Sequence, residues 1–239
     1  GLTLEMAQAL KVRGVFATGI SLDSVSEAEM DLRRGMTGAW LTAVNAIENS
    51  RKAGLYTMVQ VVASRDMLQG DGLEEYVKFT RQLDVHEVRV LETLPAGRLH
   101  RIDPGEILNL KEREQLKELH IKLNRNPRNP KVSVFAHTED FDRYGCGAGT
   151  QHSYIDASGN LYPCDFVPLA MGNVLHRSLK ELWLEMHDLI GTPRDRCMIL
   201  ELSAKLRNRN GGTLPVPEDE SREMLAGLNE MDRLPGFYE

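Results

Sequence analysis

Cysteine is scarce in this sequence: only three of its 239 residues carry a thiol, at positions 146, 164 and 197. An odd number of cysteines cannot form a complete disulfide framework, so a fold held together by disulfides throughout is excluded. Scarce cysteines are typical of a reducing compartment, where thiolates more often meet metals or substrates than one another. We therefore expect a cytoplasmic protein, although isolated cysteines are also common as small buried side chains.

Positive charge is not in excess either, and long hydrophobic runs do not occur. The formal net charge is −6, whereas nucleic acids and anionic membranes select surfaces of clustered positive charge. No run of apolar residues in the sequence approaches the ~20 that are needed to cross a bilayer. The sequence therefore predicts neither a nucleic-acid partner nor a membrane partner.

The first half of the sequence does contain a repeated alternation of strand and helix patterns. Short apolar segments bounded by glycine or polar residues predict strands over 14–23 and 55–64, the first of them buried. The segment 87–98 predicts a third strand that runs into a Pro/Gly loop. Amphipathic spacing predicts helices between them, over 39–54 and 71–85. Such repeats build parallel sheets with helical crossovers, so the sequence predicts an α/β fold.

Polar side chains follow the predicted strands, at the end where parallel sheets bind ligands. A further charged helix is predicted over 109–126 and a further strand over 131–136, after which the alternation stops. Position alone leaves two interpretations open for the residues at the strand ends. Each can contact a ligand, or it can simply cap a strand end or form a turn. They are Ser21, Asp23, Ala63, Ser64, Glu92 and Thr93.

The second half contains a hairpin pattern, YGCGAGTQHSYIDASGNLYPCDFVP, over 144–168. The segment DASGN supplies turn-forming side chains, and Gly159 can adopt a positive φ. Cys146 precedes this turn and Cys164 follows it, so the hairpin can bring the two thiols together, and Cys197 follows the next predicted helix. Clustered thiolates favour zinc or iron–sulfur centres, but the spacing alone does not choose between such a centre and inert buried thiols.

The spacing Cys146, twelve residues, Gly159, four residues, Cys164 resembles the C-x(9–15)-G-x4-C signature of the SPASM and twitch domains of radical SAM enzymes. Upstream, the segment GISLDSVSEAEMDLRRGMTGAW (19–40) is similar to the fourth strand of a radical SAM partial barrel and the stretch after it, commonly written SLD followed by HD-x-x-RG. The segment VLETLPAGR (90–98) resembles the sixth strand and its exit. The resemblance covers about residues 1–200, in the order of the family.

The resemblance implies the C-terminal half of a radical SAM partial (β/α)6 barrel, followed by a small SPASM- or twitch-like domain of a β-hairpin plus a helix. We expect the barrel part over 1–140, the auxiliary-cluster domain over 141–204 and a C-terminal tail over 205–239. Two departures from the family are that Met30 replaces its histidine and that its CxxxCxxC loop does not occur. The chain thus resembles a radical SAM protein without its first third, in which strand 14–23 would expose an unpaired edge and favour dimerisation or poor solubility.

For an intact family member, the resemblance implies that S-adenosyl-L-methionine (AdoMet) is cleaved at a [4Fe-4S] cluster held by the CxxxCxxC loop. The resulting 5′-deoxyadenosyl radical would abstract a hydrogen atom from a peptide or small-molecule substrate, with an electron donor such as flavodoxin or ferredoxin. The resemblance assigns no catalytic residue. The AdoMet contacts that it implies are Ser21, Arg34, Gln60 and Leu91.

The resemblance also implies an auxiliary [4Fe-4S] cluster, held by Cys146, Cys164 and Cys197. Its fourth iron site would be open or occupied by Asp165, His152 or His187. Two other functions stay open. One is a non-catalytic module of the same fold that binds a peptide or a protein partner. The other is a zinc-binding structural domain, with one of the two histidines as fourth ligand.

Overall fold

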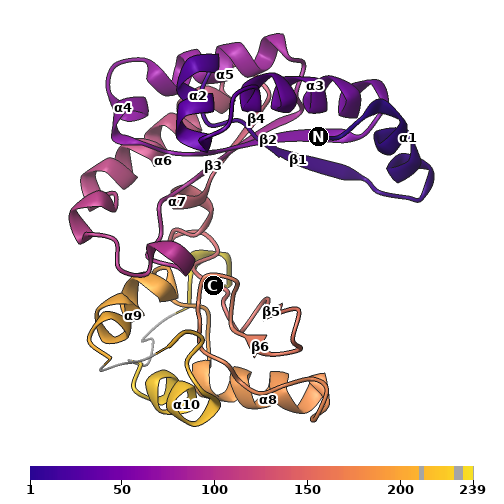
Figure 1. The fold of residues 1–239 in the computed structure, drawn as a ribbon. Coiled ribbons are helices and arrows are strands. Elements are labelled where there is room, and N and C mark those ends of the chain that lie inside the picture. Colours follow the sequence, from indigo (N-terminus) through magenta and orange to yellow (C-terminus); the bar gives the residue numbers. More distant parts are fainter. Residues whose placement is uncertain (210–212, 229–233, 239) are drawn as a thin grey trace. The chain divides into compact units, whose positions relative to one another are not determined.

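A computed structural model describes residues 1–209, 213–228 and 234–238 and divides the chain into two compact units (Figure 1). Unit 1 comprises Gly1–Thr93 and Leu108–His137, and unit 2 comprises Leu94–Ile107 and Thr138–Glu239. The loop at 94–107 thus belongs with the second half of the chain. The predicted ranges 1–140, 141–204 and 205–239 stay predictions as domain boundaries, and the last of them lies partly outside the described residues.

A parallel sheet of four strands forms the centre of unit 1, in the order β1-β2-β3-β4 (Figure 1). This arrangement confirms the predicted α/β fold. The strands are β1 (Ala17–Ser21), β2 (Tyr56–Val62), β3 (Glu87–Leu91) and β4 (Lys131–Val134).

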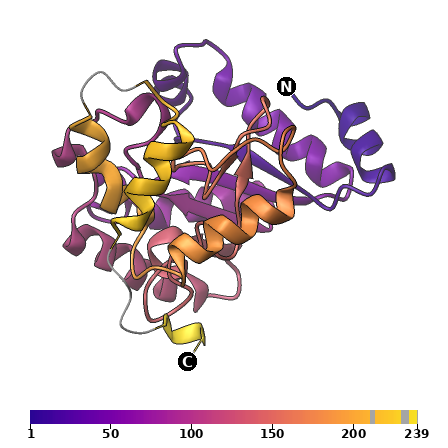
Figure 2. The same ribbon diagram turned by 90° about the horizontal axis from the view of Figure 1, so that it is seen from below.

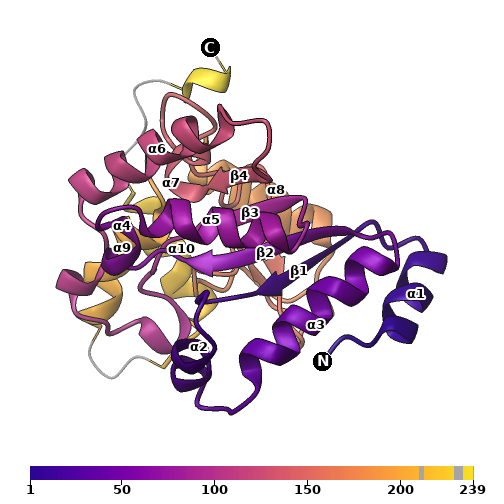
Figure 3. The same cartoon turned by 90° about the horizontal axis from the view of Figure 1, so that it is seen from above.

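The helices between residues 27 and 124 pack against one face of this sheet, as Figure 3 shows from the helix-covered side. Alternate residues of the strands, such as Val59, Val61 and Val88, are buried beneath them, while the residues between these are not part of the core. The sheet therefore has a covered face and an open face within unit 1. The helices of unit 1 are α1 (Leu4–Val12), α2 (Glu27–Arg34), α3 (Ala39–Lys52), α4 (Arg65–Leu68), α5 (Gly72–Gln82), α6 (Leu110–Asn124) and, where unit 1 passes into unit 2, α7 (Phe135–Thr138).

Local capping explains where several of these helices begin and end. The Ser26 side chain accepts a hydrogen bond from the backbone N–H of Glu29 at the start of α2, and Gly35 ends that helix with a φ of 62°. At the start of α6, Asn109 and Glu112 form a reciprocal capping box. These contacts lie within a few residues of one another, which is why the sequence predicts the helices well.

One of the strand predictions is confirmed and another is wrong in detail. As predicted, the strand that begins at Glu87 runs into a loop: it ends at Leu91, and Pro95 and Gly97, whose φ is 54°, follow in unit 2. The first strand is not buried as predicted, since Gly19 and Ser21 are exposed on the open face. A parallel strand is buried on both sides only where helices cover both faces of its sheet.

In the part of unit 2 that the structure describes, three helices and the predicted hairpin are joined by long irregular segments (Figure 2). This unit has its own hydrophobic core. In the hairpin, β5 and β6 pair antiparallel, and Gly159 lies in the turn between them with a φ of 86°. The elements of this unit are β5 (Tyr154–Ile155), β6 (Leu161–Tyr162), α8 (Leu179–Ile190), α9 (Met198–Arg207), α10 (Glu218–Ala226) and the short 3-10 turns η1 (Gly97–Leu99), η2 (Pro104–Glu106) and η3 (Gly236–Tyr238). Among the described helices of either unit, none has the length and apolar character to cross a membrane.

The edge position of β1 predicts self-association, because the outer side of this strand pairs with no described strand. Phe16, immediately before β1, is 72% exposed and provides an apolar contact beside that edge. We expect dimers in sedimentation velocity, and Phe16→Lys should shift the distribution towards monomer. The control Leu110→Lys, at a position that is 84% exposed and lies outside the sheet, should not. A compact monomer for the unaltered chain would contradict this prediction.

Candidate metal centre

The hairpin places Cys164 through hydrogen bonds centred on Asp156. The carboxylate of Asp156 accepts hydrogen bonds from the backbone N–H groups of Ser158 and Asn160, at 2.8 and 2.9 Å, and from the Tyr162 hydroxyl at 2.8 Å. The Asn160 side chain also donates to it, and these bonds together lower the pKa of Asp156 to about 2. The turn is therefore fixed by a carboxylate that stays ionised, and β6 leads directly from it to Cys164.

We expect the stabilising effect of Asp156 to depend on pH. Its pKa is depressed in the folded chain, so it stabilises the fold above the ~4 of an unperturbed aspartate and loses this effect as the pH falls towards about 2. Asp156→Asn should lower the unfolding temperature at pH 7, and the difference from the unaltered chain should shrink through this acid range. Thermal unfolding followed at several pH values tests this. A difference that is constant with pH would show that the charge is not the cause.

The glycine-rich loop around Cys146 is tied to the end of the hairpin. The backbone N–H of Gly149 donates to the carbonyl of Pro163 at 2.8 Å, one residue before Cys164. Gly149 has a φ of 72°, and an added Cβ would lie 2.2 Å from Cδ1 of Ile190. Glycine is thus required where the two cysteine-bearing segments meet.

A short antiparallel bridge brings Cys146 towards Cys197. The backbone N–H of Cys146 donates to the Arg194 carbonyl at 2.8 Å, and the Arg194 N–H donates back to the Cys146 carbonyl at 2.9 Å. The Arg194 side chain is only 3% exposed and binds the carboxylate of Glu201 through Nε and Nη2, at 2.8 and 3.0 Å. The segment before Cys197 is therefore held by the backbone of Arg194 to Cys146 and by its side chain to Glu201. Cys197 itself is the N-cap residue of α9.

The thiols of Cys146 and Cys197 are hydrogen-bonded to each other and buried. The hydrogen bond from Cys197 lowers the pKa of Cys146 to about 6, with further help from the backbone N–H groups of Ala148 and Met198 and from the Arg194 charge. The same contact, together with burial, raises the pKa of Cys197. At neutral pH the pair thus favours one thiolate, on Cys146, stabilised by one thiol.

Cys164 is half-buried beside this pair. Burial raises its pKa to about 12, and its Sγ donates a hydrogen bond to the carboxylate of Asp165 at 3.1 Å. The electrostatic interaction between Cys164 and Cys146 also raises the pKa of Cys164. None of the three cysteines forms a disulfide.

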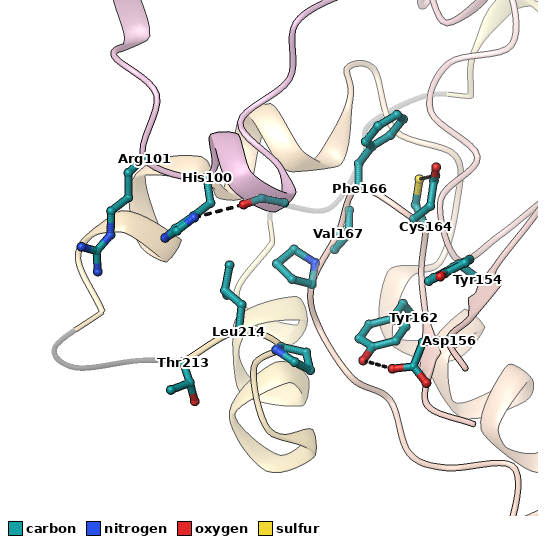
Figure 4. A pocket seen from close by; sticks show the side chains of 14 residues that line it. His100, Arg101, Tyr154, Asp156, Tyr162, Cys164, Phe166, Val167, Thr213 and Leu214 are labelled. Carbon is teal, nitrogen blue, oxygen red and sulfur yellow. Dashed lines mark hydrogen bonds between the residues drawn. The ribbon is translucent and has the colours of Figure 1, made fainter. Parts of the chain in front are cut away.

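Cys164 opens onto a largely apolar cavity of about 640 Å³ in unit 2 (Figure 4). Tyr154, Tyr162 and Phe166 line one part of its wall, and His100 and Arg101 belong to another. An aromatic wall with a few polar groups is the usual character of a small-molecule site. A ligand bound in this cavity would lie next to the Cys164 sulfur.

The three cysteines offer thiolates, which are the usual ligands of iron–sulfur clusters and also bind zinc. Among the described residues, no group of three or more histidine, cysteine or acidic side chains is arranged closely enough to hold one metal ion. The three thiols are soft donors of the kind that binds clusters, and the ligands of a cluster attach to different irons and stand further apart than those of one ion. Of the candidates for a fourth ligand, Asp165 contacts Cys164, whereas His187 packs near the Trp183 ring.

The residues at the strand ends of unit 1 divide into two groups. Ser64 caps α4, and Glu92 forms an ion pair with Arg113 at 2.8 Å, so both have structural roles. Ser21 and Gln60 lie side by side, since they are register partners of β1 and β2 on the open face.

The other two predicted AdoMet contacts lie nearby in unit 1. Leu91 ends β3 opposite Val62, two residues beyond the register partner of Gln60. Arg34 forms an ion pair with Asp23 beyond the end of β1. The structure thus brings Ser21 and Gln60 together and places Leu91 and Arg34 towards the same end of the sheet.

Sequence reasoning missed Arg89 and Ser133, which continue the row of Ser21 and Gln60 across β3 and β4. The signal was present in the segments EVRVL and KVSV, where polar residues alternate with valine. Arg194 was also missed, because its short bridge to Cys146 leaves no periodic pattern in the sequence.

Comparison with known proteins supports the resemblance. Residues 146–193 match the SPASM family, an iron–sulfur cluster-binding domain. An AdoMet-dependent heme synthase of Methanosarcina barkeri is 22% identical over 201 residues, covering 76% of this chain and 57% of that protein. The corresponding protein of Nitratidesulfovibrio vulgaris is 24% identical over 204 residues, covering 76% and 55%. The chain spans about half the length of these curated relatives.

Solved structures with the same fold include two enzymes bound to peptides or AdoMet. Native anSMEcpe with bound AdoMet aligns with a TM-score of 0.56 and 19% identity, over 75% of this chain and 53% of that one. In complex with AdoMet and the Kp18Cys peptide it aligns with a TM-score of 0.57 and 17% identity, over 93% and 69%. Streptococcus suis SuiB bound to its precursor peptide SuiA aligns with a TM-score of 0.56 and 14% identity, over 74% and 44%. These likenesses confirm the expected fold.

Proposed function

We propose, from the premise that this chain has the fold of radical SAM enzymes and carries their SPASM-type domain, that it is part of an enzyme that abstracts hydrogen atoms from a peptide or small-molecule substrate. Cleavage of AdoMet at a [4Fe-4S] cluster supplies the 5′-deoxyadenosyl radical for this chemistry. Unit 1 would position AdoMet, and unit 2 would hold an auxiliary cluster.

Four residues of unit 1 would contact AdoMet. Ser21 and Gln60 offer neighbouring hydrogen-bonding groups on the open face, and Leu91 offers an apolar contact at the end of β3. Arg34 would bind the carboxylate of AdoMet, because the hydrogen bond from its Nε to Asp23 already holds the guanidinium in place. The position of Ser21, Gln60 and Leu91 towards the carboxyl ends of parallel strands, with Arg34 paired to Asp23 just beyond β1, supports this assignment.

Cys146, Cys164 and Cys197 would ligate the auxiliary [4Fe-4S] cluster in unit 2. The observation that carries this proposal is the convergence of their segments, through the bridge of Cys146 to Arg194 and the bond of Gly149 to Pro163. The Arg194 guanidinium would hold the ligand segments in position and add positive charge near thiolates that are negative when they bind iron. Asp165 is the candidate for the fourth iron site that contacts a ligand residue.

Anaerobic reconstitution with iron and sulfide tests the cluster. The chain should take up iron and develop the broad visible absorption of an iron–sulfur protein. The double variant Cys146→Ala/Cys164→Ala should lose both signals, because at most one of the three thiolates would remain. His176→Ala, at an exposed histidine of unit 2 that is not among the candidate ligands, should retain them. A colourless chain supplied with iron and sulfide would contradict the proposal, and bound zinc in its place would favour the structural zinc domain.

The substrate is proposed only as a class. The heme synthases named above act on a small molecule to form heme, whereas SuiB and anSMEcpe are solved with peptides. The cavity beside Cys164 could receive part of either kind of substrate, because it is apolar and open at the sulfur. An electron donor such as flavodoxin or ferredoxin would complete the system.

A further inference from the structure

A row of polar side chains crosses the open face of the unit 1 sheet. Ser21 of β1 is in register with Gln60 of β2, Gln60 with Arg89 of β3, and Arg89 with Ser133 of β4. We call these four residues the polar row. Because side chains alternate between the two faces of a sheet, register partners at one level point to the same side. The covered face has valine and isoleucine at the neighbouring level, in Ile20, Val59, Val88 and Val132.

Arg89 is the charged member of the polar row, and a buried carboxylate fixes it. Its Nε donates to Oε1 of Glu87 at 2.9 Å, and Oε2 of Glu87 accepts a hydrogen bond from the Tyr56 hydroxyl at 3.0 Å. The Glu87 side chain is 7% exposed, whereas that of Arg89 is 39% exposed. The guanidinium is thus held along one edge.

The two terminal nitrogens of Arg89 form no hydrogen bond with the residues that the structure describes. They are therefore available to a ligand over the open face. A planar guanidinium with two free N–H groups matches a carboxylate in a bidentate arrangement. Gln60 and Ser133, on either side of Arg89, add neutral hydrogen-bonding groups.

The charge of the open face also favours an anion. Its charged side chains within the four strands are Glu87, Arg89 and Lys131, where Lys131 is the register partner of Glu87. This part of the sheet therefore carries one net positive charge, in a chain whose net charge is −6. A surplus of positive charge on an open face with polar neighbours is complementary to an organic acid.

We propose that Arg89 binds a carboxylate of the substrate, so that the substrate is an organic acid and Arg89 is a specificity-determining residue. The assignment rests on the proposed function, because Ser21 and Gln60 of the polar row are there assigned to AdoMet. The substrate carboxylate would then lie over β3, beside AdoMet over β1 and β2. The polar row orients both molecules over the same face.

Equilibrium binding to the full chain tests this assignment with two pairs of probes. One pair is heme, the compound for which the related synthases are named, and its dimethyl ester, and the other is a peptide with a single glutamate and the same peptide with glutamine in its place. Arg89→Met should weaken binding of the charged member of at least one pair roughly ten-fold or more, as expected for a lost charge-assisted bond. Arg89→Lys should lose less, since it keeps the charge. The neutral probes, AdoMet and the exposed control variant Arg128→Met should show no change.

Three outcomes would overturn the assignment. Equal binding by Arg89→Met and the unaltered chain would leave Arg89 as a partner of Glu87 alone. An unaltered chain that prefers neither charged probe over its neutral counterpart would exclude an acid. A weakened affinity of Arg89→Met for AdoMet, but not for its decarboxylated analogue, would show that Arg89 binds the carboxylate of AdoMet instead.

Iron uptake is measured separately in every variant, so a failure of the cluster is distinguished from a failure of this site. In a Trp183→Phe background, in which Trp40 is the one remaining tryptophan, fluorescence reports whether unit 1 is folded.

Discussion

Replacing Arg194 by methionine should destabilise unit 2 by about 3–5 kcal/mol, the usual cost of removing one member of a buried ion pair. The Arg194 side chain is 3% exposed and that of Glu201 14%, and their two hydrogen bonds are bidentate. The variant leaves the Glu201 carboxylate without its guanidinium partner in a largely desolvated place. We also expect the segment before Cys197 to shift, and with it the uptake of iron.

The double variant Arg194→Met/Glu201→Leu separates charge from packing. Apolar side chains of similar volume often replace a buried pair at little cost, so the double variant should recover most of the lost stability. Trp183 in unit 2 and Trp40 in unit 1 are the two tryptophans of the chain. In a Trp40→Phe background, denaturant unfolding followed by fluorescence therefore reports on unit 2. A loss below about 1 kcal/mol for Arg194→Met would instead indicate a solvent-screened pair.

The features that the sequence predicts well depend on neighbours in the chain. The hairpin between Cys146 and Cys164 follows from the turn at Gly159, and the helices follow from local caps such as Ser26. The relation of Cys197 to Cys146 was expected from a resemblance alone. Physically it depends on a two-residue bridge to Arg194, and such a bridge has no periodicity to detect.

The polar row shows a different limit of sequence reasoning. Short runs of valine predict a strand over 55–64 and another that begins at Glu87, but they do not reveal whether one or both faces of the sheet are covered. Gln60 is a single polar residue among valines, and the alternation of Glu87 and Arg89 with valine spans one short segment, which is too little to define a polar face of a whole sheet. Register between four strands makes the row evident, and register is a property of the folded sheet. That Cys146, Cys164 and Cys197 bind a cluster stays a prediction.

Gly149→Ala should be the second most damaging single change, with a loss of about 3 kcal/mol. The added Cβ would lie 2.2 Å from Cδ1 of Ile190 and 3.3 Å from Cγ of Met186, in a close-packed core. The φ of 72° adds about 1–2 kcal/mol of backbone strain for any residue with a Cβ. Because the Gly149 N–H also ties the Cys146 loop to Pro163, the variant should bind less iron as well.

Ile190→Val removes the one atom that the new Cβ would strike, so it provides a test of the cause. By itself this change deletes a methyl group from the core and should cost about 0.5–1.5 kcal/mol. In the Gly149→Ala background it should stabilise unit 2 instead, leaving mainly the backbone strain. Unfolding of the four chains, followed by Trp183 fluorescence, measures this coupling. Two additive losses would show that Ile190 does not limit the space at residue 149, and that the glycine is required for its backbone conformation alone.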